Sequence, residues 1–308
     1  MSEVDDMIHS LDVPAMQSFQ TMTARGPNFA RNIGRIIGRA IVVAIALAAM
    51  LRAPEIAAAD EVKASGVKLV LIGATSRTAG EIIPQALALG HQVVGVARRP
   101  EEITLKNNQL RTMKGDVLDI ASLEAALHGD EVVISMVGPA PIMSATEFKD
   151  FGPTNLMSQG TANIIQAMKK KGNKRLIVAS SSLAEIVMVD GPPPADAPPH
   201  VRYMWSMRTA YQDERDMEAV VRVSGLDTVI LRPGFIVSSP ARHDLQLAIT
   251  DQGRGNLTPK RTIITYADLA ELTLKQVVSN EYIGKTIGIY SNVCPKGTTL
   301  ETSGCVNR

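Results

Sequence analysis

The chain has 308 residues, 45% of them hydrophobic, and a formal net charge of +1 at pH 7. This length fits one large domain or two small ones, and the apolar content supports a sizeable core. The near-neutral balance argues against nucleic acid as the main partner, because phosphate binding favours a concentrated positive face. Cys294 and Cys305 form no Cys-x-x-Cys pair, so no metal site is predicted, and whether they pair in a disulfide stays open.

The first 59 residues differ from the rest and are predicted to be an N-terminal extension. Four arginines between positions 25 and 39 precede an apolar run at 40–51. This run is too short to span a bilayer comfortably but suits the core of a signal peptide, and Ala57-Ala58-Ala59 offers a cleavage site. Positive charge before the run would direct the following domain outward. Segment 25–59 therefore predicts export or membrane anchoring, with a cytoplasmic protein as the alternative.

From residue 67 onward, short apolar runs alternate with helical segments. The predicted strands are 68–73, 91–97, 110–115, 131–138, 174–180 and 227–234. The predicted helices are one that ends near residue 89, then 120–129, 155–171, 204–223 and 265–280. Continuous β-branched runs between helices indicate parallel strands covered on both faces. Residues 60–308 are therefore predicted to form one α/β domain with a doubly wound parallel sheet, the Rossmann fold.

Two stretches break this alternation and are predicted to be irregular. Residues 190–200 contain five prolines, and residues 238–256 show no helix or strand pattern. The first stretch follows the fifth strand, so it is expected near the carboxyl edge of the sheet, where ligands bind in such folds.

The turn after the first strand has the composition of a phosphate-binding turn. In dinucleotide-binding folds, this turn presents backbone amides at a helix N-terminus to the pyrophosphate. The spacing Gly73-x-x-Ser76-x-x-Ala79-Gly80 replaces two of the usual glycines by the smallest alternatives, so close approach remains possible. Ser76 and Thr78 add hydroxyl donors. The alternative is an ordinary strand–helix turn.

The end of the second predicted strand indicates which dinucleotide is bound. An NAD enzyme usually carries an acidic residue there for the ribose 2′-hydroxyl. This chain has Arg98 and Arg99 instead, and Arg77 lies in the first turn. Guanidinium groups suit a 2′-phosphate because they offer bidentate, charge-assisted hydrogen bonds. The sequence therefore favours NADP over NAD, and a pair of solvated arginines is the alternative.

Six segments, in this order, resemble the atypical short-chain dehydrogenases with an NAD(P)-binding fold, and the nearest group is the biliverdin-reductase-B/flavin-reductase and NmrA-like proteins. The resemblance covers roughly residues 67–290. The segments are "IGATSRTAGEIIPQALALGHQVVGVARRPEEI", "GDVLDIASLEAAL", "EVVISMVG", "NIIQAMKKKGNKRLIVASSS", "SGLDTVILRPG" and "ITYADLAELTLKQVV".

This resemblance implies NADPH as the cofactor, held at matching positions. The pyrophosphate and nearby groups would be held by Gly73, Thr75, Ser76, Arg77, Thr78 and Ala79. The 2′-phosphate would lie at Arg98 and Arg99, and the adenine beside Asp116 and Val117. The ribose would lie beside Val137 and Gly138, and the nicotinamide beside Ser180 and Ser181.

The catalytic residues are less well defined by the resemblance. Typical members use a Tyr-x-x-x-Lys pair, in which the ammonium lowers the phenol pKa. This chain offers Tyr211 followed by Arg215, and arginine cannot relay a proton. Tyr211 is therefore a candidate catalytic residue or a packed aromatic. Ser181 matches the substrate-side serine of the biliverdin-reductase-B-like enzymes, or is a simple strand-end hydroxyl.

The leading hypothesis is an NADPH-dependent oxidoreductase that transfers hydride to a small or aromatic conjugated acceptor. The alternative is a non-catalytic NAD(P)-binding regulator or assembly factor of the NmrA-like type. A nucleotide-sugar epimerase or dehydratase would be expected to retain both the tyrosine and the lysine. The expected partner is a small molecule, with membrane contact only through the N-terminal segment and no nucleic acid.

Overall fold

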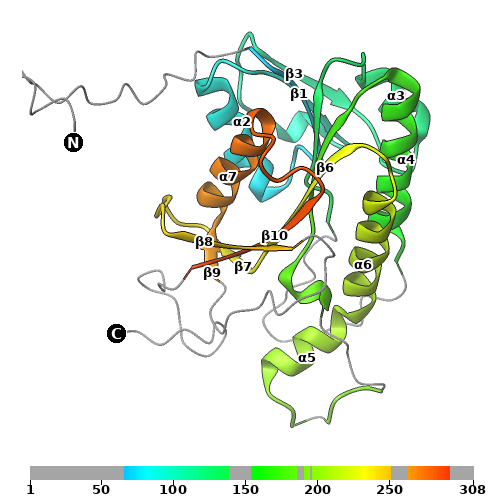
Figure 1. Cartoon of the computed structure of the whole chain (residues 1–308). Coiled ribbons are helices and arrows are strands. Elements are labelled where there is room, and N and C mark those ends of the chain that lie inside the picture. Colours follow the sequence, from blue (N-terminus) through cyan, green and yellow to red (C-terminus); the bar gives the residue numbers. More distant parts are fainter. Residues whose placement is uncertain (1–65, 139–153, 186–190, 195, 251–262, 292–308) are drawn as a thin grey trace, which may run out of the picture. The chain divides into compact units, whose positions relative to one another are not determined.

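The computed structural model describes residues 66–138, 154–185, 191–194, 196–250 and 263–291, and in this part of the chain eight strands form one large sheet (Figure 1). Their order is β3-β2-β1-β4-β5-β6-β10-β8. These strands are β1 (Lys68–Ile72), β2 (Gln92–Ala97), β3 (Leu110–Lys114), β4 (Val132–Ser135), β5 (Arg175–Ala179), β6 (Asp227–Pro233), β8 (Leu245–Thr250) and β10 (Lys285–Ser291). A second, two-stranded sheet pairs β7 (Phe235–Val237) with β9 (Ile263–Thr265).

The strands from β3 to β10 pair in parallel, and β8 adds an antiparallel edge to β10. Leu69 of β1 aligns with Val93 of β2 on one side and with Val132 of β4 on the other. The chain moves outward from β1 through β2 to β3, then returns to the other side of β1 at β4. This order is the doubly wound Rossmann arrangement, so the predicted fold class is confirmed.

Helices cover both faces of the sheet, and Figure 1 shows α2 and α7 on one side with α3, α4 and α6 on the other. The helices are α2 (Arg77–Ala88), α3 (Ile120–Ala126), α4 (Leu156–Lys171), α5 (Pro199–Ser206), α6 (Arg208–Arg222) and α7 (Tyr266–Val278), with short 3-10 turns η2 (Pro100–Glu102) and η3 (Ser182–Glu185). Strand β1 contributes to both cores, because successive side chains point to opposite faces. Leu69 and Leu71 pack on the α2/α7 side, and Val70 and Ile72 on the α3/α4/α6 side.

Two helix ends follow the local signals in the sequence. Gly172 ends α4 in the left-handed conformation, with φ of 91°, which glycine adopts without steric cost. Thr265 caps α7 by accepting a hydrogen bond from the Asp268 amide at 3.0 Å, and its hydroxyl donates to the Asp268 carboxylate at 2.7 Å. Local sequence is sufficient at these points because each end is stabilised within about one turn.

Two predictions at the C-terminal half of the domain are wrong. The stretch 238–256 was expected to be irregular, but residues 245–250 form β8, and 251–256 lie outside the described residues. Strand β8 exists because it pairs with β10, a partner far along the chain. The helix expected at 204–223 is two helices, and Met207 separates α5 from α6 as the N-cap of α6.

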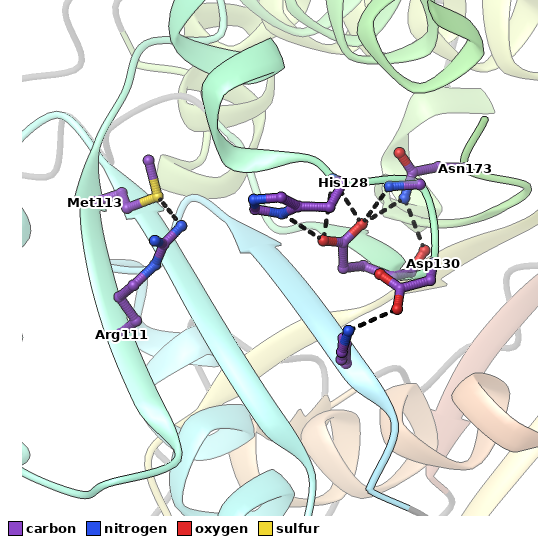
Figure 2. Close-up of polar contacts among 8 residues, drawn as sticks. Arg111, Met113, His128, Asp130 and Asn173 are labelled. Atoms are coloured by element: carbon purple, nitrogen blue, oxygen red, sulfur yellow. Dashed lines mark hydrogen bonds and ion pairs between the residues drawn. The ribbon is translucent and has the colours of Figure 1, made fainter. Parts of the chain in front are cut away.

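A buried carboxylate joins the starts of β4 and β5 at the amino edge of the sheet, opposite the edge expected to bind ligands (Figure 2). Glu131, directly before β4, accepts hydrogen bonds from the His128 amide at 3.0 Å and from Asn173 Nδ2 at 2.9 Å. Burial alone would raise the pKa of Glu131, but the hydrogen bonds from Asn173 and His128 lower it to about 2. Beside it, Lys68 of β1 pairs with Asp130 at 2.7 Å. This group is therefore structural.

Among the described residues, no helix is both long enough and apolar enough to cross a membrane. The predicted extension 1–59, with its apolar run at 40–51, lies outside the described residues, as do Cys294 and Cys305.

Candidate functional site

The residues predicted to bind the cofactor lie at the carboxyl ends of five adjacent parallel strands. Because these ends share one edge of the sheet, the structure brings together residues that are far apart in the sequence. The turn after β1 and the first residues of α2 contain Gly73, Thr75, Ser76, Arg77, Thr78 and Ala79. The ends of the other four strands are followed by Arg98 and Arg99 (β2), Asp116 and Val117 (β3), Val137 and Gly138 (β4), and Ser180 and Ser181 (β5). Strand β1 lies where the strand order reverses, which is the usual ligand position in open α/β sheets.

The turn after β1 packs closely against the ends of the two neighbouring strands, β2 and β4. Gly73 has a φ of 81°, and a Cβ there would lie 2.8 Å from the Met136 carbonyl oxygen, so only glycine fits without a shift. The amides of Gly73 and Ala74 both donate to the Val96 carbonyl, at 3.0 and 3.1 Å. The turn is thus held in place by its two neighbouring strands.

The first backbone amides of α2 are not all used in hydrogen bonds among the described residues. Ser76 is the N-cap, and its hydroxyl oxygen accepts from the Ala79 amide at 3.1 Å. Ala79 is fully buried, and its methyl group packs in the core. The amides of Arg77 and Thr78 have no hydrogen-bond partner in the described part of the chain. Free amides at a helix N-terminus form a binding site for an anion.

The two arginines after β2 are both exposed but differ in their surroundings. Arg99 Nη1 pairs with Glu102 Oε1 at 2.9 Å. Arg98 makes no hydrogen bond or ion pair with any described residue. Arg98 is therefore the guanidinium that an incoming phosphate would meet without competition.

Residues after β3 and β4 form the next part of the edge. Asp116 Oδ1 accepts from the Leu118 amide at 3.0 Å, so this carboxylate stabilises its own turn. The Val117 carbonyl accepts from Asn163 Nδ2 at 2.9 Å, which ties the turn to α4. Val137 is half-buried and Gly138 is exposed.

Three consecutive serines follow β5, and each has a different environment. The Ser180 hydroxyl donates to Glu218 Oε1 at 2.6 Å inside the protein. The Ser181 hydroxyl is half-buried and accepts from the Leu183 amide at 3.1 Å at the start of η3. Ser182 is 2% exposed, and its hydroxyl has no partner in the described part of the chain.

The partner of Ser180 belongs to a buried ionic group that the sequence analysis missed. Glu218 of α6 accepts from Arg232 Nε at 2.7 Å and Nη2 at 2.6 Å, and from Arg222 Nη2 at 2.5 Å. Burial alone would raise the pKa of Glu218, but the hydrogen bonds and charge of Arg232, with Ser180 and Arg222, lower it. The sequence offered one signal for this buried group. Glu218 lies at an apolar position of the helical period, near Val221 and four residues before Arg222.

Tyr211 and Arg215 lie one turn apart on α6. Tyr211 is 4% exposed. Arg215 Nη1 donates to the Ala184 carbonyl at 2.7 Å, and its Nε donates to Gln212 at 3.2 Å. Much of the Arg215 guanidinium is thus committed to η3 and to its own helix, which weakens the case for it as the substitute for the family's lysine.

His243, Asp268 and Glu271 also place potential ligand atoms within 4.8 Å of one another. However, Asp268 Oδ1 accepts from the amides of Arg242 and His243, each at 2.9 Å, and Oδ2 accepts from Thr265. The Asp268 oxygens therefore fix the loop before β8 and the start of α7, and they offer little to a cation.

A family model described as NAD(P)H-binding matches residues 73–280, from the first turn to the end of α7. The chain belongs to the NAD(P)H-binding family. The resemblance to the NAD(P)-binding atypical short-chain dehydrogenases is confirmed, and the match supports a nicotinamide dinucleotide as the cofactor.

Solved structures similar to this NAD(P)H-binding protein share the fold. A Rossmann-fold NAD(P)-binding family protein from Shigella flexneri is 23% identical, with a TM-score of 0.54 over 76% of this chain and 95% of that one. An anaerobillin reductase from Escherichia coli O157:H7 is 20% identical, with a TM-score of 0.56 over 74% of this chain and 100% of that one. A short-chain dehydrogenase/reductase from Veillonella parvula, in complex with NADP, is 17% identical, with a TM-score of 0.53 over 73% and 94%.

An uncharacterized chloroplastic protein of Arabidopsis thaliana is 25% identical over an alignment of 179 residues, and the match covers 56% of this chain. The chain matches 60% of the length of that relative.

Proposed function

We propose that this protein is an NADPH-dependent oxidoreductase that transfers hydride to a small or aromatic conjugated acceptor. The observation that carries the proposal is the start of α2, where the amides of Arg77 and Thr78 have no partner among the described residues and Gly73 allows no side chain. These amides would bind the pyrophosphate, since a helix N-terminus combines free N–H donors with a positive dipole end.

The preference for NADPH over NADH rests on Arg98 and Arg99. Arg98 is exposed and unpaired among the described residues, so it can bind a 2′-phosphate without losing an existing contact. Arg99 would have to share its guanidinium with Glu102. We therefore expect Arg98 to contribute more than Arg99 to the preference. The Veillonella structure with NADP is consistent with this cofactor on this fold.

When bound, the nicotinamide supplies the hydride, and the protein contributes binding, orientation and exclusion of water. Ser180 and Ser181 would lie beside the nicotinamide ring, at the carboxyl end of β5. Ser180 is held by Glu218, so Ser181 is the better candidate to donate a hydrogen bond to the acceptor. The anaerobillin reductase, named as a reductase, is consistent with a reductase activity on this fold.

Cofactor choice is tested by calorimetric titration of NADPH and NADH into the protein and three variants. Losing one charge-assisted contact costs about 1.5–3 kcal/mol, so Arg98→Ala should weaken NADPH binding by roughly 10- to 150-fold and leave NADH binding unchanged. Arg99→Ala should have a smaller effect. Arg111→Ala is the control, because this exposed arginine lies at the start of β3, away from the carboxyl edge. Equal affinity of the parent for both cofactors would contradict the proposal.

Catalysis is tested by following NADPH consumption with panels of flavins, quinones and conjugated carbonyl compounds. We expect turnover with at least one conjugated acceptor. Tight NADPH binding without turnover of any acceptor would support the alternative, a non-catalytic NAD(P)-binding regulator or assembly factor. In that case the replacement of the family's lysine by Arg215 would explain the lack of turnover.

We also propose that residues 25–59 direct export or membrane anchoring and that the NAD(P)H-binding domain begins near residue 60. The chloroplastic relative is consistent with a targeting segment before this domain. Sequencing the N-terminus of the mature protein, together with cell fractionation, tests both statements. A mature protein that is soluble, cytoplasmic and begins at Met1 would contradict them.

A further inference from the structure

Glu214 is a buried carboxyl group that makes no hydrogen bond with any described residue. It is 7% exposed, and its Oε2 atom has no contact with solvent or a polar partner. Buried polar groups in folded proteins are nearly always paired, so such an atom calls for an explanation such as a ligand or a catalytic role. The other carboxylates of α6 that are buried, Asp213 and Glu218, are both saturated with donors.

Glu214 lies on α6 just before two residues, Arg215 and Glu218, that contact the segment following β5. Four residues later on the same helix face, Glu218 binds the Ser180 hydroxyl at 2.6 Å. The next residue, Arg215, donates to the Ala184 carbonyl of η3 at 2.7 Å. The side chain of Glu214 is therefore placed at the carboxyl end of β5, where the nicotinamide and its acceptor would lie.

A second unpaired group belongs to the element that packs against this part of α6. Ser182, in η3, is 2% exposed and its hydroxyl also lacks a partner in the described part of the chain. Two orphaned polar atoms on two elements in contact, both at the ligand edge, indicate polar atoms of a bound molecule as their missing partners.

The charges around Glu214 favour its neutral form. Burial, and the negative charges of Glu218 and Asp213, raise the pKa of Glu214 to about 8, although Arg232 from β6 and Arg215 act in the opposite direction. At neutral pH this carboxyl group therefore holds a proton. A proton held at this pKa is suited to general acid catalysis, because it is available and yet readily transferred.

We propose that Glu214 is the catalytic acid of the reductase reaction, a role that rests on the function proposed above. As the electrophilic carbon of the acceptor receives hydride, the electron pair of its double bond moves to the far end of the conjugated system. The O–H bond of Glu214 breaks, and the proton bonds to that atom. The Glu214 carboxylate then takes a proton from solvent, so the acceptor gains one hydride and one proton.

The test compares the parent with Glu214→Gln, Glu214→Met and Asp216→Asn. Asp216 is the matched control, since it is an exposed carboxylate on the same helix, paired with Gln212. NADPH affinity should be the same in all four proteins. With the best acceptor, both Glu214 variants should lose about 10²- to 10⁴-fold in kcat/KM, the range for a general acid, and Asp216→Asn should lose nothing.

Two pH measurements separate catalysis from structure. The parent should lose kcat/KM as pH rises through the pKa of Glu214, and this limb should vanish from the residual activity of Glu214→Gln. Independently of activity, an infrared titration of the cofactor-free parent should show a protonated carboxyl that ionises at about pH 8 and is missing from Glu214→Gln. Glu214→Met, which also lacks the proton, replaces Glu214→Gln if the latter does not fold.

Unchanged kcat/KM and pH profile in a folded Glu214 variant would overturn this proposal and leave the NADPH-dependent reductase standing. The same holds if the infrared titration shows Glu214 ionised at pH 6. If the parent binds NADPH but reduces no acceptor, the proposed function and the role of Glu214 fall together.

Discussion

Replacing Gly73 by alanine tests the geometry on which the cofactor site depends. The change places a methyl group 2.8 Å from the Met136 carbonyl oxygen, at a φ of 81°. The left-handed conformation costs an alanine roughly 1–2 kcal/mol. Displacing the end of β4 adds roughly 1–3 kcal/mol, as for other overpacked sites. We therefore expect the free energy of unfolding to fall by about 2–5 kcal/mol.

Gly80→Ala, in the first turn of α2, is the matched control. A Cβ at Gly80 meets nothing within 4 Å, so this variant should be stabilised by about 1 kcal/mol through helix propensity. Urea unfolding gives both free energies, and titration with NADPH gives the affinities. Gly73→Ala should also bind NADPH more weakly, because the turn and the first amides of α2 move with β4. A Gly73→Ala protein as stable as the parent would refute the argument.

Two further predictions concern stability and catalysis. Because the effect of burial is outweighed by hydrogen bonds from Asn173 and His128, which hold the pKa of Glu131 at about 2, below the ordinary glutamate value of 4.5, the contribution of this carboxylate to stability is present above pH 4.5 and is lost as pH falls towards 2. At about 1.4 kcal/mol per pKa unit this amounts to roughly 3.5 kcal/mol. Urea unfolding of Glu131→Gln should lack this pH dependence, and a variant whose stability changes with pH as steeply as the parent's would contradict the prediction. Tyr211→Phe should keep most reductase activity, because Arg215 stands where the family's Tyr-x-x-x-Lys pattern has its lysine. Ser181→Ala should lose several-fold, since one neutral hydrogen bond contributes roughly 0.5–1.5 kcal/mol. Measured kcat/KM values showing a 10²-fold or larger loss only in Tyr211→Phe would make the phenol the proton donor.

Much of the ligand edge was predictable because its signals are local. The strand, turn and helix around Gly73 lie within one short segment, and the parallel fold follows from alternation of apolar runs and helices. In a doubly wound sheet the carboxyl ends of the strands share one edge by topology alone. Residues as distant in sequence as Arg98 and Ser181 could thus be assigned to one site without coordinates.

Other features depend on partners that the local sequence does not identify. Strand β8 has no strong pattern of its own and exists through its pairing with β10. The single helix expected at 204–223 is interrupted at Met207, where α6 starts anew. In both places tertiary pairing decided what local propensity left open.

Sequence alone determined the fold class, the strand–turn–helix unit around Gly73 and the edge of the sheet that carries the residues proposed to bind the cofactor, because each depends on chain order and short-range pattern. Only the tertiary structure decided what the acidic residues of α6 do. Asp213, Glu214 and Glu218 look alike in sequence, yet one caps α4, one is unpaired and one is held by Arg232. The physical reason is that a carboxyl group takes its charge state from burial and from neighbours brought by other elements, and neither is encoded within the helix itself.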